Sequence, residues 1–236
     1  MKTRVVVVTL VLALFGLAPS ASALPFLQLD ASGGWYNTGT ESITTIQTQF
    51  DLFLLVKSLT VPDYLFYSVA LTPQTSIGAD LGSISIDRVP LAVTEGMVYG
   101  IPPLDLFGDL GDPDLGPHSV YPTFFQQFRA PTTGWFTIAP YDAEASPGGF
   151  ATRSADGTMW AVAVPIDLSE LESGYGLHFD LYTTKTGRKA GSGTDIDEFA
   201  PFSHDLDAQP VPEPASMLLL GTGLLGAGFL ARRRKP

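Results

Sequence analysis

The stretch that decides the fold is LHFDLY at residues 177–182. Apolar and polar side chains alternate along it, so an extended backbone places three apolar residues on one face and His178 and Asp180 on the other. Its length, its aromatic content and the glycine before it are typical of a β-strand with one buried face. The stretch therefore predicts a sheet whose polar face carries a histidine next to a carboxylate.

Five further runs share this strand character and are bounded by glycine, proline or polar turns; they cover residues 50–56, 63–71, 83–87, 134–138 and 159–164. No long amphipathic helix and no internal repeat accompanies them, while residues 167–171 fit a helical turn or a loop. Short strands without helices to cover a parallel sheet favour an all-β fold, an antiparallel β-sandwich. A jelly roll or a barrel is the neighbouring alternative.

Charge and cysteine content exclude several classes of function. Residues 24–209 contain seven Lys and Arg against 23 Asp and Glu, a net charge of −16. Nucleic-acid binding is excluded, because contacts to phosphate depend on clustered basic side chains. The chain contains no cysteine, which rules out disulfides, thiolate nucleophiles and zinc–thiolate sites.

The first 23 residues have the layout of a secretory signal peptide. Lys2 and Arg4 precede an uncharged apolar run at residues 5–18, and small residues at Ala21 and Ala23 fit the pattern that signal peptidase cleaves. The run is short for a membrane span, which needs about 20 residues. We therefore expect cleavage after Ala23, with a retained N-terminal anchor as the alternative.

The last 27 residues, 210–236, form a second processing segment with three parts. The triad Pro212, Glu213, Pro214 precedes an uncharged, glycine-rich stretch at 215–231, whose length as a helix, about 26 Å, is marginally enough to span a bilayer. Four basic residues follow: Arg232, Arg233, Arg234 and Lys235. A basic cluster keeps its end in the cytoplasm, so residues 24–209 face the other way as an exported β-rich domain.

This order of parts closely resembles the PEP-CTERM sorting signal. The resemblance implies recognition by an exosortase, cleavage near the triad, an inner-membrane intermediate and delivery to the cell surface or beyond. It also implies a Gram-negative type of envelope and, as a partner, exopolysaccharide. The two prolines hold the triad extended, which suits an enzyme that must reach backbone just outside the bilayer. The alternative is a tail anchor that is never cut.

The middle of the chain resembles the choice-of-anchor N proteins. Residues 177–182 followed by 195–205 are similar to the end of that family, and residues 100–104, 116–118 and 121–125 to its middle. Leu24 and Pro25, with residues 27–30, fit its start. The family name implies similar exported domains on differing anchors, and it implies no established activity. Residues 205–209 mark the boundary before the tail.

A metal or catalytic role for histidine would have to use His118, His178 or His204. His178 and Asp180 share one strand face, and His204 and Asp205 follow an apolar segment that could fold back onto the sheet. These residues predict a polar site, composed of His178, Asp180, His204 and Asp205. The alternative is that the strand face is solvated and that His204 bonds to backbone.

Acidic, glycine-rich loops supply a candidate calcium site. Asp105, Asp109, Asp112 and Asp114 lie within ten residues among glycines and a proline, and Asp195, Asp197 and Glu198 follow a Gly-Ser-Gly turn. Calcium takes six to eight oxygen ligands from such loops, although neither segment has EF-hand spacing. Solvated acid is the alternative, and no other cofactor is indicated.

The leading interpretation is a non-enzymatic exported surface or extracellular-matrix protein that an exosortase system processes. A carbohydrate-binding or adhesive module is the alternative, since aromatic rings stack on sugars; its candidates are Trp35, Tyr36, Trp135 and Trp160. A glycoside hydrolase is the third reading, because such enzymes need only two carboxylates. No G-x-S-x-G nucleophile motif is present.

Overall fold

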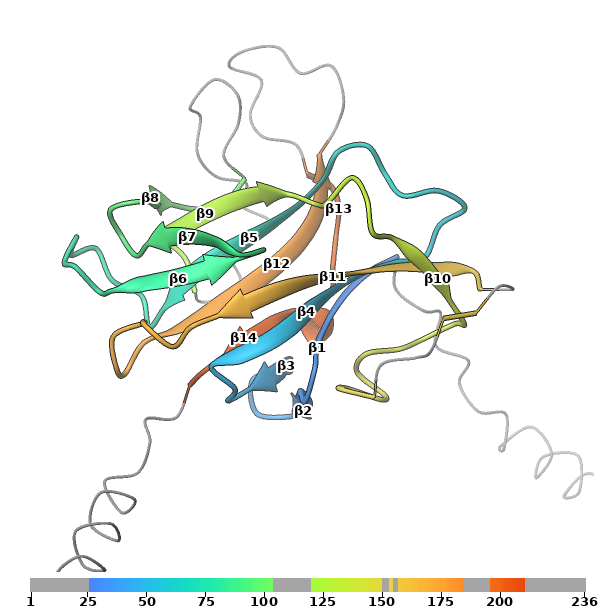
Figure 1. Ribbon diagram of the computed structural model, residues 1–236, viewed down its shortest axis with the longest axis horizontal. Coiled ribbons are helices and arrows are strands. Elements are labelled where there is room, and N and C mark those ends of the chain that lie inside the picture. The colour runs from blue at the N-terminus through green and yellow to red at the C-terminus, as the bar shows by residue number, and fades with distance from the viewer. Residues whose placement is uncertain (1–25, 104–119, 150–152, 155–156, 185–195, 211–236) are drawn as a thin grey trace, which may run out of the picture.

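The computed structural model describes residues 26–103, 120–149, 153–154, 157–184 and 196–210, and these residues fold into two β-sheets (Figure 1). The predicted signal peptide, the acidic loop at 105–114 and the predicted spanning segment at 215–231 lie outside the described residues. Within the described ranges, no helix has the length and apolar character needed to cross a bilayer.

The first sheet contains six strands. Its order is β1 (Leu27–Ala31), β4 (Gln49–Val56), β11 (Met159–Asp167), β6 (Ser83–Ile86) and β7 (Val89–Ala92), and β10 (Phe136–Ile138) also pairs with β11. Every pairing in it is antiparallel.

The second sheet contains eight strands. Its order is β2 (Trp35–Asn37), β3 (Ser42–Thr45), β14 (Leu206–Ala208), β12 (Gly176–Thr184), β5 (Leu65–Thr72), β9 (Thr123–Arg129) and β8 (Val98–Gly100), with β13 (Ile196–Phe199) also on β12. A 3₁₀ turn, η2 (Phe202–His204), leads into β14.

The predicted all-β class is confirmed, and each of the six predicted runs contributes a strand. The predicted antiparallel arrangement holds for every pairing between the described strands except one, because β14 pairs with β3 in parallel. β14 lies between β12 and β3. It runs antiparallel to β12 and parallel to β3. The segment that the sequence marks as a boundary therefore contains the last strand of the sheet.

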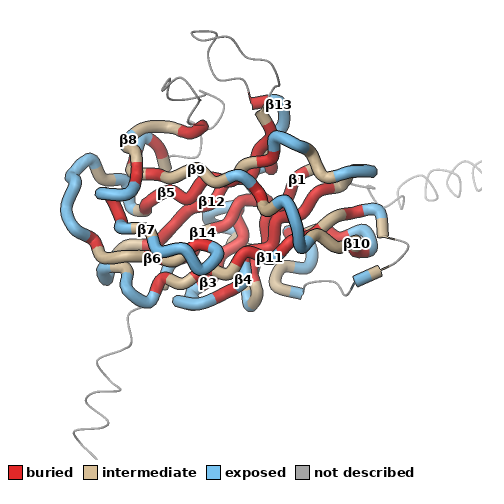
Figure 2. Tube along the Cα trace, turned by 45° about the horizontal axis from the view of Figure 1, so that its top comes forward, coloured by how far each residue is buried: buried red, intermediate tan, exposed pale blue. Residues whose placement is uncertain are grey.

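One hydrophobic core joins the two sheets, as the buried band in Figure 2 shows. In the first sheet Leu54 stands opposite both Leu29 and Val162, and all three are buried. The Phe50 ring meets the Phe179 ring of the second sheet edge-on, with centroids 6.2 Å apart. Each fully buried aliphatic or aromatic side chain contributes about 1.5–3 kcal/mol, so the inter-sheet core dominates stability.

A second, smaller hydrophobic cluster covers the outer face of the eight-stranded sheet. It contains Tyr121, Phe125, Tyr182 and Ile196. Because of this cover, eight of the nine residues of β12 are buried, on both faces of the strand. Polar side chains on its outer face are therefore removed from water.

The segment 141–149 covers the outer face of β1 in the other sheet. Gln28, which points away from the core, donates through Nε2 to the Tyr141 carbonyl at 3.0 Å and accepts the Ala143 N–H at 2.9 Å. Both sheets thus have polar groups buried on their outer faces.

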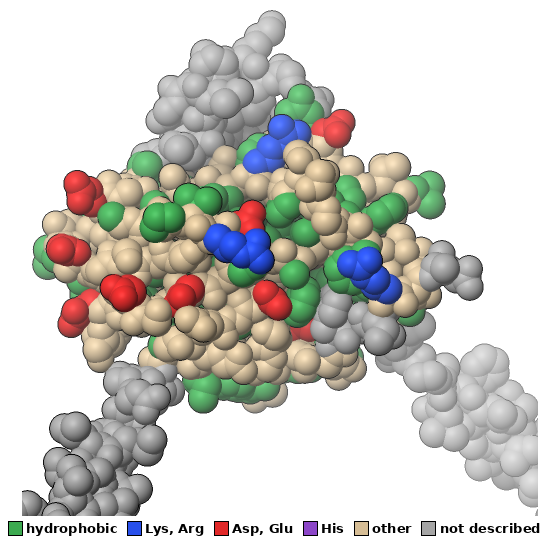
Figure 3. All heavy atoms as spheres, in the orientation of Figure 1, with side chains coloured by type: hydrophobic (Ala, Val, Ile, Leu, Met, Phe, Trp, Pro, Cys, Tyr) green, Lys and Arg blue, Asp and Glu red, His purple; other side chains and the backbone are tan. Residues whose placement is uncertain are grey.

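The molecular surface is acidic on the face drawn in Figure 3, where red carboxylate side chains are spread over the surface and the blue Lys and Arg side chains lie apart from one another. No basic stripe is formed on this face. Contacts to successive phosphates need such a stripe.

Candidate functional site

The polar face of β12 is the starting point of the candidate site. The alternation at 177–182 persists in the fold: the apolar residues face the core, and His178 and Asp180 face outward under the second cluster. Antiparallel pairing places Asp207 of β14 directly opposite His178. Asp205, two residues earlier, falls on the same side as Asp207, because residues i and i+2 of an extended chain share a face.

His178 bridges two carboxylates. Its Nδ1 donates to Asp207 Oδ1 at 2.8 Å, and its Nε2 donates to Asp180 Oδ1 at 3.2 Å. Burial would lower the pKa of His178, but the carboxylates of Asp180 and Asp207 outweigh it and raise that pKa well above its ordinary value. The imidazole is therefore protonated at neutral pH, and both of its N–H groups are used.

The second oxygen of Asp180 is held by hydroxyl groups. Asp180 Oδ2 accepts hydrogen bonds from Ser68 Oγ at 2.9 Å and from the Tyr121 hydroxyl. Burial, followed by the nearby charge of Asp180, raises the pKa of Tyr121 well above its ordinary value, so its hydroxyl stays a donor. The Tyr121 ring also packs edge-on against His178.

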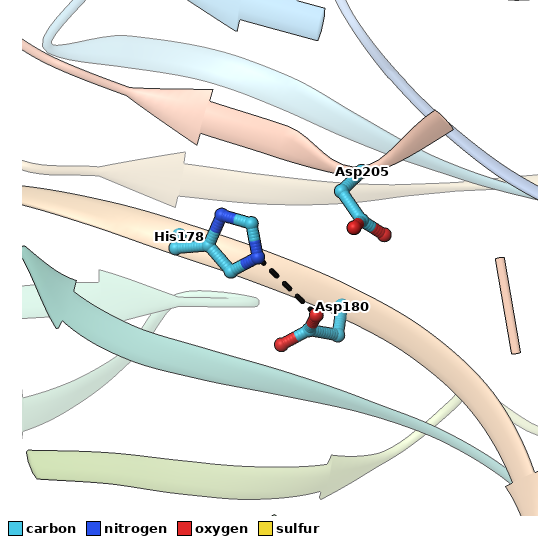
Figure 4. A group of neighbouring side chains, drawn as sticks. All are labelled: His178, Asp180 and Asp205. Atoms are coloured by element: carbon cyan, nitrogen blue, oxygen red, sulfur yellow. Dashed lines mark hydrogen bonds and ion pairs between the residues drawn. The ribbon is translucent and has the colours of Figure 1, made fainter. Parts of the chain in front are cut away.

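Asp205 completes a group of three. One ligand atom from each of His178, Asp180 and Asp205 lies within 4.8 Å of the others. Figure 4 shows the three side chains converging from β12 and from the residue just before β14. The relative exposures of His178, Asp180 and Asp205 are 3%, 1% and 1%, so the group is enclosed.

The two aspartates next to His178 on the β14 side differ in protonation. Burial, together with the charge of Asp180, raises the pKa of Asp205 well above its ordinary value. Burial would also raise the pKa of Asp207, but hydrogen bonds from His178 and Ser42 and the charge on His178 hold it below its ordinary value. Asp207 is therefore the charged partner of the imidazole, while Asp205 favours its neutral form.

His204 lies elsewhere. It belongs to η2, and its Nε2 faces Asp142 Oδ1 at 3.2 Å while Nδ1 faces Ser203 Oγ at 2.8 Å. The structure thus brings together three members of the predicted four-residue site and directs the fourth to the segment that covers β1. Neither His178 nor Asp180 is on a solvated face.

Asp207, Ser68, Tyr121 and Ser42 belong to the same network and were not identified from the sequence. Ser42 Oγ donates to Asp207 Oδ2 at 2.6 Å. Their contribution depends on contacts between residues that are 29 to 165 positions apart in the chain. The alternation of Asp205 and Asp207 was the one local signal that could have indicated a second polar strand.

A separate buried carboxylate, Asp30 on β1, was also missed. It accepts hydrogen bonds from the Tyr141 hydroxyl and from the backbone N–H groups of Ala31 at 2.8 Å and Gly148 at 2.9 Å. Burial raises the pKa of Asp30, although these three hydrogen bonds oppose the shift. Its partners identify it as the anchor of the 141–149 segment.

The remaining predicted residues are placed as follows. The four aspartates of the candidate calcium loop lie outside the described residues, whereas Asp197 and Glu198 are exposed on β13. Trp135 and Trp160 line one hollow of about 400 Å³ beside Arg153. Trp35 and Tyr36 are on β2, in the other sheet, so the four aromatic residues form two separate pairs.

Comparison with known proteins identifies the tail alone. Residues 210–235 match the PEP-CTERM protein-sorting motif. No curated protein and no solved structure matches the chain. The motif indicates an exported protein that an exosortase recognises and sorts to the cell surface by way of the membrane. The likeness to the choice-of-anchor N family is not shown and stays a prediction.

Proposed function

We propose that this chain is a non-enzymatic surface or extracellular-matrix protein that is exported, held at the inner membrane by its tail and then released by an exosortase-type enzyme. In this proposal, residues 1–23 are the signal peptide, 24–209 the exported domain and 210–236 the sorting tail with its membrane helix at 215–231. Signal peptidase and exosortase are its processing partners.

The observation that carries the proposal is the position of the sorting motif relative to the last strand. The motif begins at residue 210, and β14 ends at Ala208. The Gln209 N–H still donates to the Thr45 carbonyl at 2.9 Å, so the folded domain extends to this residue. Only Pro210 and Val211 separate it from the triad. Cutting near Pro214 would leave every strand of the domain in place.

At the His178 group, a binding or structural role is favoured over catalysis because its titratable side chains are enclosed. His178, Asp180 and Asp205 are at most 3% exposed, and a polymeric substrate cannot reach such side chains. Glycoside hydrolysis needs two carboxylates that flank a bound sugar. This enclosure argues against the His178 group as the catalytic pair of a glycoside hydrolase.

Carbohydrate binding, with exopolysaccharide as the partner, stays a prediction. Its support is the hollow between Trp135 and Trp160, since aromatic faces can stack on sugar rings. The indole N–H of Trp135 is already used by the Pro131 carbonyl at 2.6 Å. The rings would therefore contribute their faces rather than that donor.

Intact-mass analysis of the surface protein, in a host with and without its exosortase, tests the proposal. The expected product begins at Leu24 and ends near Pro214 only when the enzyme is present. Glu213→Ala should trap the precursor in the inner membrane. Glu198→Ala, which changes an exposed glutamate on β13, is the matched control and should be processed normally.

Surface protein that still carries Arg232 to Lys235 would overturn the proposal. So would equal processing of the Glu213→Ala and wild-type chains, because recognition would then not involve the triad.

A further inference from the structure

Two buried carboxylates and one partly buried carboxylate surround a single imidazole at the junction of β12 and β14. Asp180 and Asp207 contact the two nitrogens of His178, and Asp205 lies on the same face within ligand distance of both His178 and Asp180. Asp180 and Asp205 are buried, and the side chain of Asp207 is 14% exposed. Buried carboxylates are stable when they are paired or when they coordinate a metal.

We propose that His178 Nε2, Asp180 and Asp205 bind a divalent transition metal of the zinc or manganese class. This inference goes beyond the proposed sorting function, because it concerns the interior of the exported domain. The carboxylates of Asp180 and Asp205 balance the double positive charge of the ion, and Asp207 keeps its hydrogen bonds from His178 Nδ1 and Ser42 Oγ. When the ion binds, His178 Nε2 and the carboxyl group of Asp205 each release one proton to water, and Nε2 then ligates through its lone pair.

The separations of the ligand atoms fit such an ion. Zinc bonds of about 2.0–2.1 Å in a tetrahedron place neighbouring ligand atoms about 3.4 Å apart. His178 Nε2 and Asp180 Oδ1 are 3.2 Å apart, and the three atoms all lie within 4.8 Å of one another. Small side-chain rotations would therefore complete three protein ligands, with the fourth position left for water.

The surrounding hydrogen bonds have the arrangement that orients metal ligands. A ligating histidine usually donates its other ring N–H to a carboxylate, which fixes the ring and raises its basicity. Here His178 Nδ1 donates to Asp207 at 2.8 Å, and Ser42 holds Asp207 in turn at 2.6 Å. Ser68 and Tyr121 fix the oxygen of Asp180 that is not directed at His178.

Thr44 on this face has a buried hydroxyl without a hydrogen-bond partner among the described residues. Ser42 bonds Asp207, so Thr44, two residues along β3, points to the same face, and the register places it beside Asp207. Thr44 is 5% exposed, and its hydroxyl has no hydrogen-bond partner among the described residues. The face thus has buried polar capacity that the protein groups around it do not use.

The donor set selects the class of ion. Calcium takes six to eight oxygens, whereas this enclosed group offers one nitrogen and two carboxylates. Imidazole together with carboxylate suits zinc or manganese. The ion would join β12 to the residue that leads into β14, the strand next to the sorting tail, and would thereby stabilise the domain after export.

Metal content after refolding tests the inference. The full chain, purified in mild detergent, is unfolded with chelator and refolded with Zn²⁺, Mn²⁺, Ca²⁺ or no metal, because an enclosed site loads during folding. We expect one Zn²⁺ or Mn²⁺ per chain by mass spectrometry and a higher Tm than without metal. Asp205→Asn and His178→Gln should abolish this binding, and Asp207→Asn should weaken it about 10–100-fold.

The matched controls are Asp30→Asn and His204→Gln, which change a buried aspartate and a buried histidine outside the group and should keep the metal. Folded wild-type chain without bound metal, binding of Ca²⁺ alone, or metal retained by Asp205→Asn would each overturn the inference. If the site variants fail to fold, X-ray absorption of the wild-type zinc form decides. One imidazole with carboxylate oxygens is expected, and two or three imidazoles would contradict it.

Discussion

Asp30 on β1 and Asp180 on β12 are both buried carboxylates on the outer faces of the two sheets, and each accepts the hydroxyl of a tyrosine. They differ in their other partners. Asp30 is bound by the backbone N–H groups of Ala31 and Gly148. Asp180 is bound by the side chains of Ser68 and His178, with a second carboxylate, that of Asp205, in the same group.

This difference separates a loop anchor from a ligand site. Each hydrogen bond of Asp30 fixes a position of the chain, and Gly148 is suited to it: its φ is +66°, and an added Cβ would lie 2.5 Å from the Gly34 carbonyl. At Asp180 one partner, His178, can exchange a proton for a metal ion, and Asp205 supplies a further carboxyl group beside it. Burial alone does not distinguish the two regions, but the chemistry of the partners does.

The largest effect is expected at His178. His178→Ala removes the group that neutralises Asp180 and Asp207, and loss of one partner of a buried ion pair costs about 3–5 kcal/mol. Urea unfolding of the metal-free wild-type and variant proteins measures the difference in the free energy of unfolding.

His204→Ala is the comparison for this measurement. Both histidines are 3% exposed, but His204 pairs with Asp142, whose side chain is 28% exposed and can be solvated. We therefore expect a smaller loss, about 1–3 kcal/mol. Equal losses for the two variants would show that the carboxylates around His178 need no positive partner.

A smaller and more local effect is expected at Asp30. Asp30→Ala leaves the Gly148 N–H and the Tyr141 hydroxyl without their carboxylate, at a cost of about 1–3 kcal/mol. Because these donors belong to the 141–149 segment, the segment should open before the sheets unfold. Hydrogen exchange at the Gly148 amide should accelerate, and limited proteolysis should begin within residues 141–149.

His178→Ala provides the contrast for that experiment. It lowers global stability without touching the Asp30 network, so Gly148 exchange should change only as much as the global free energy does. If Asp30→Ala and His178→Ala gave the same exchange pattern, the two regions would not be independent, and the distinction between anchor and ligand site would be wrong.

The sequence predicts the strands better than it predicts what covers them. The alternation at 177–182 correctly places His178 and Asp180 on the outer face of a sheet. That this face is buried depends on Tyr121, Phe125 and Ile196, which come from distant parts of the chain. A local pattern cannot show whether a second layer covers a polar face, and the solvated alternative followed from the pattern alone.

The local sequence also could not predict where the last strand, β14, lies in its sheet. β14 has only three residues, and its pairing with β12 and β3 joins positions that are far apart in the chain. When only the local sequence is considered, residues 205–209 therefore resemble the boundary between the exported domain and the tail. The sequence does not indicate Asp207 for the same reason. It groups His204 with Asp205 because both follow an apolar segment that could fold back onto the sheet. Their side chains point to different partners.

The smallest predicted effect is a difference in pH dependence between Asp30 and Asp167, a partly exposed aspartate at the end of β11. Burial raises the folded-state pKa of Asp30 above the ordinary value of 3.8, so the folded protein holds this proton more tightly than the unfolded chain. The stabilisation from that proton is complete below pH 3.8 and is lost as the pH rises through the folded pKa. Burial also raises the pKa of Tyr141, which stays protonated throughout.

The stability of wild type relative to Asp30→Asn should therefore fall as the pH rises from about 4 to 7, by about 1.4 kcal/mol for each pH unit that separates the folded and unfolded pKa values. Asp167→Asn supplies the opposite sign. Hydrogen bonds from Ser169 lower the pKa of Asp167, so its stabilisation is present above pH 3.8 and is lost as the pH falls through the lowered value. Urea unfolding in pH steps measures both differences. A rise in the relative stability of wild type over Asp30→Asn between about pH 4 and 7 would mean that the hydrogen bonds from Tyr141, Gly148 and Ala31 outweigh burial, and Asp30 would then be a charged anchor rather than a neutral one.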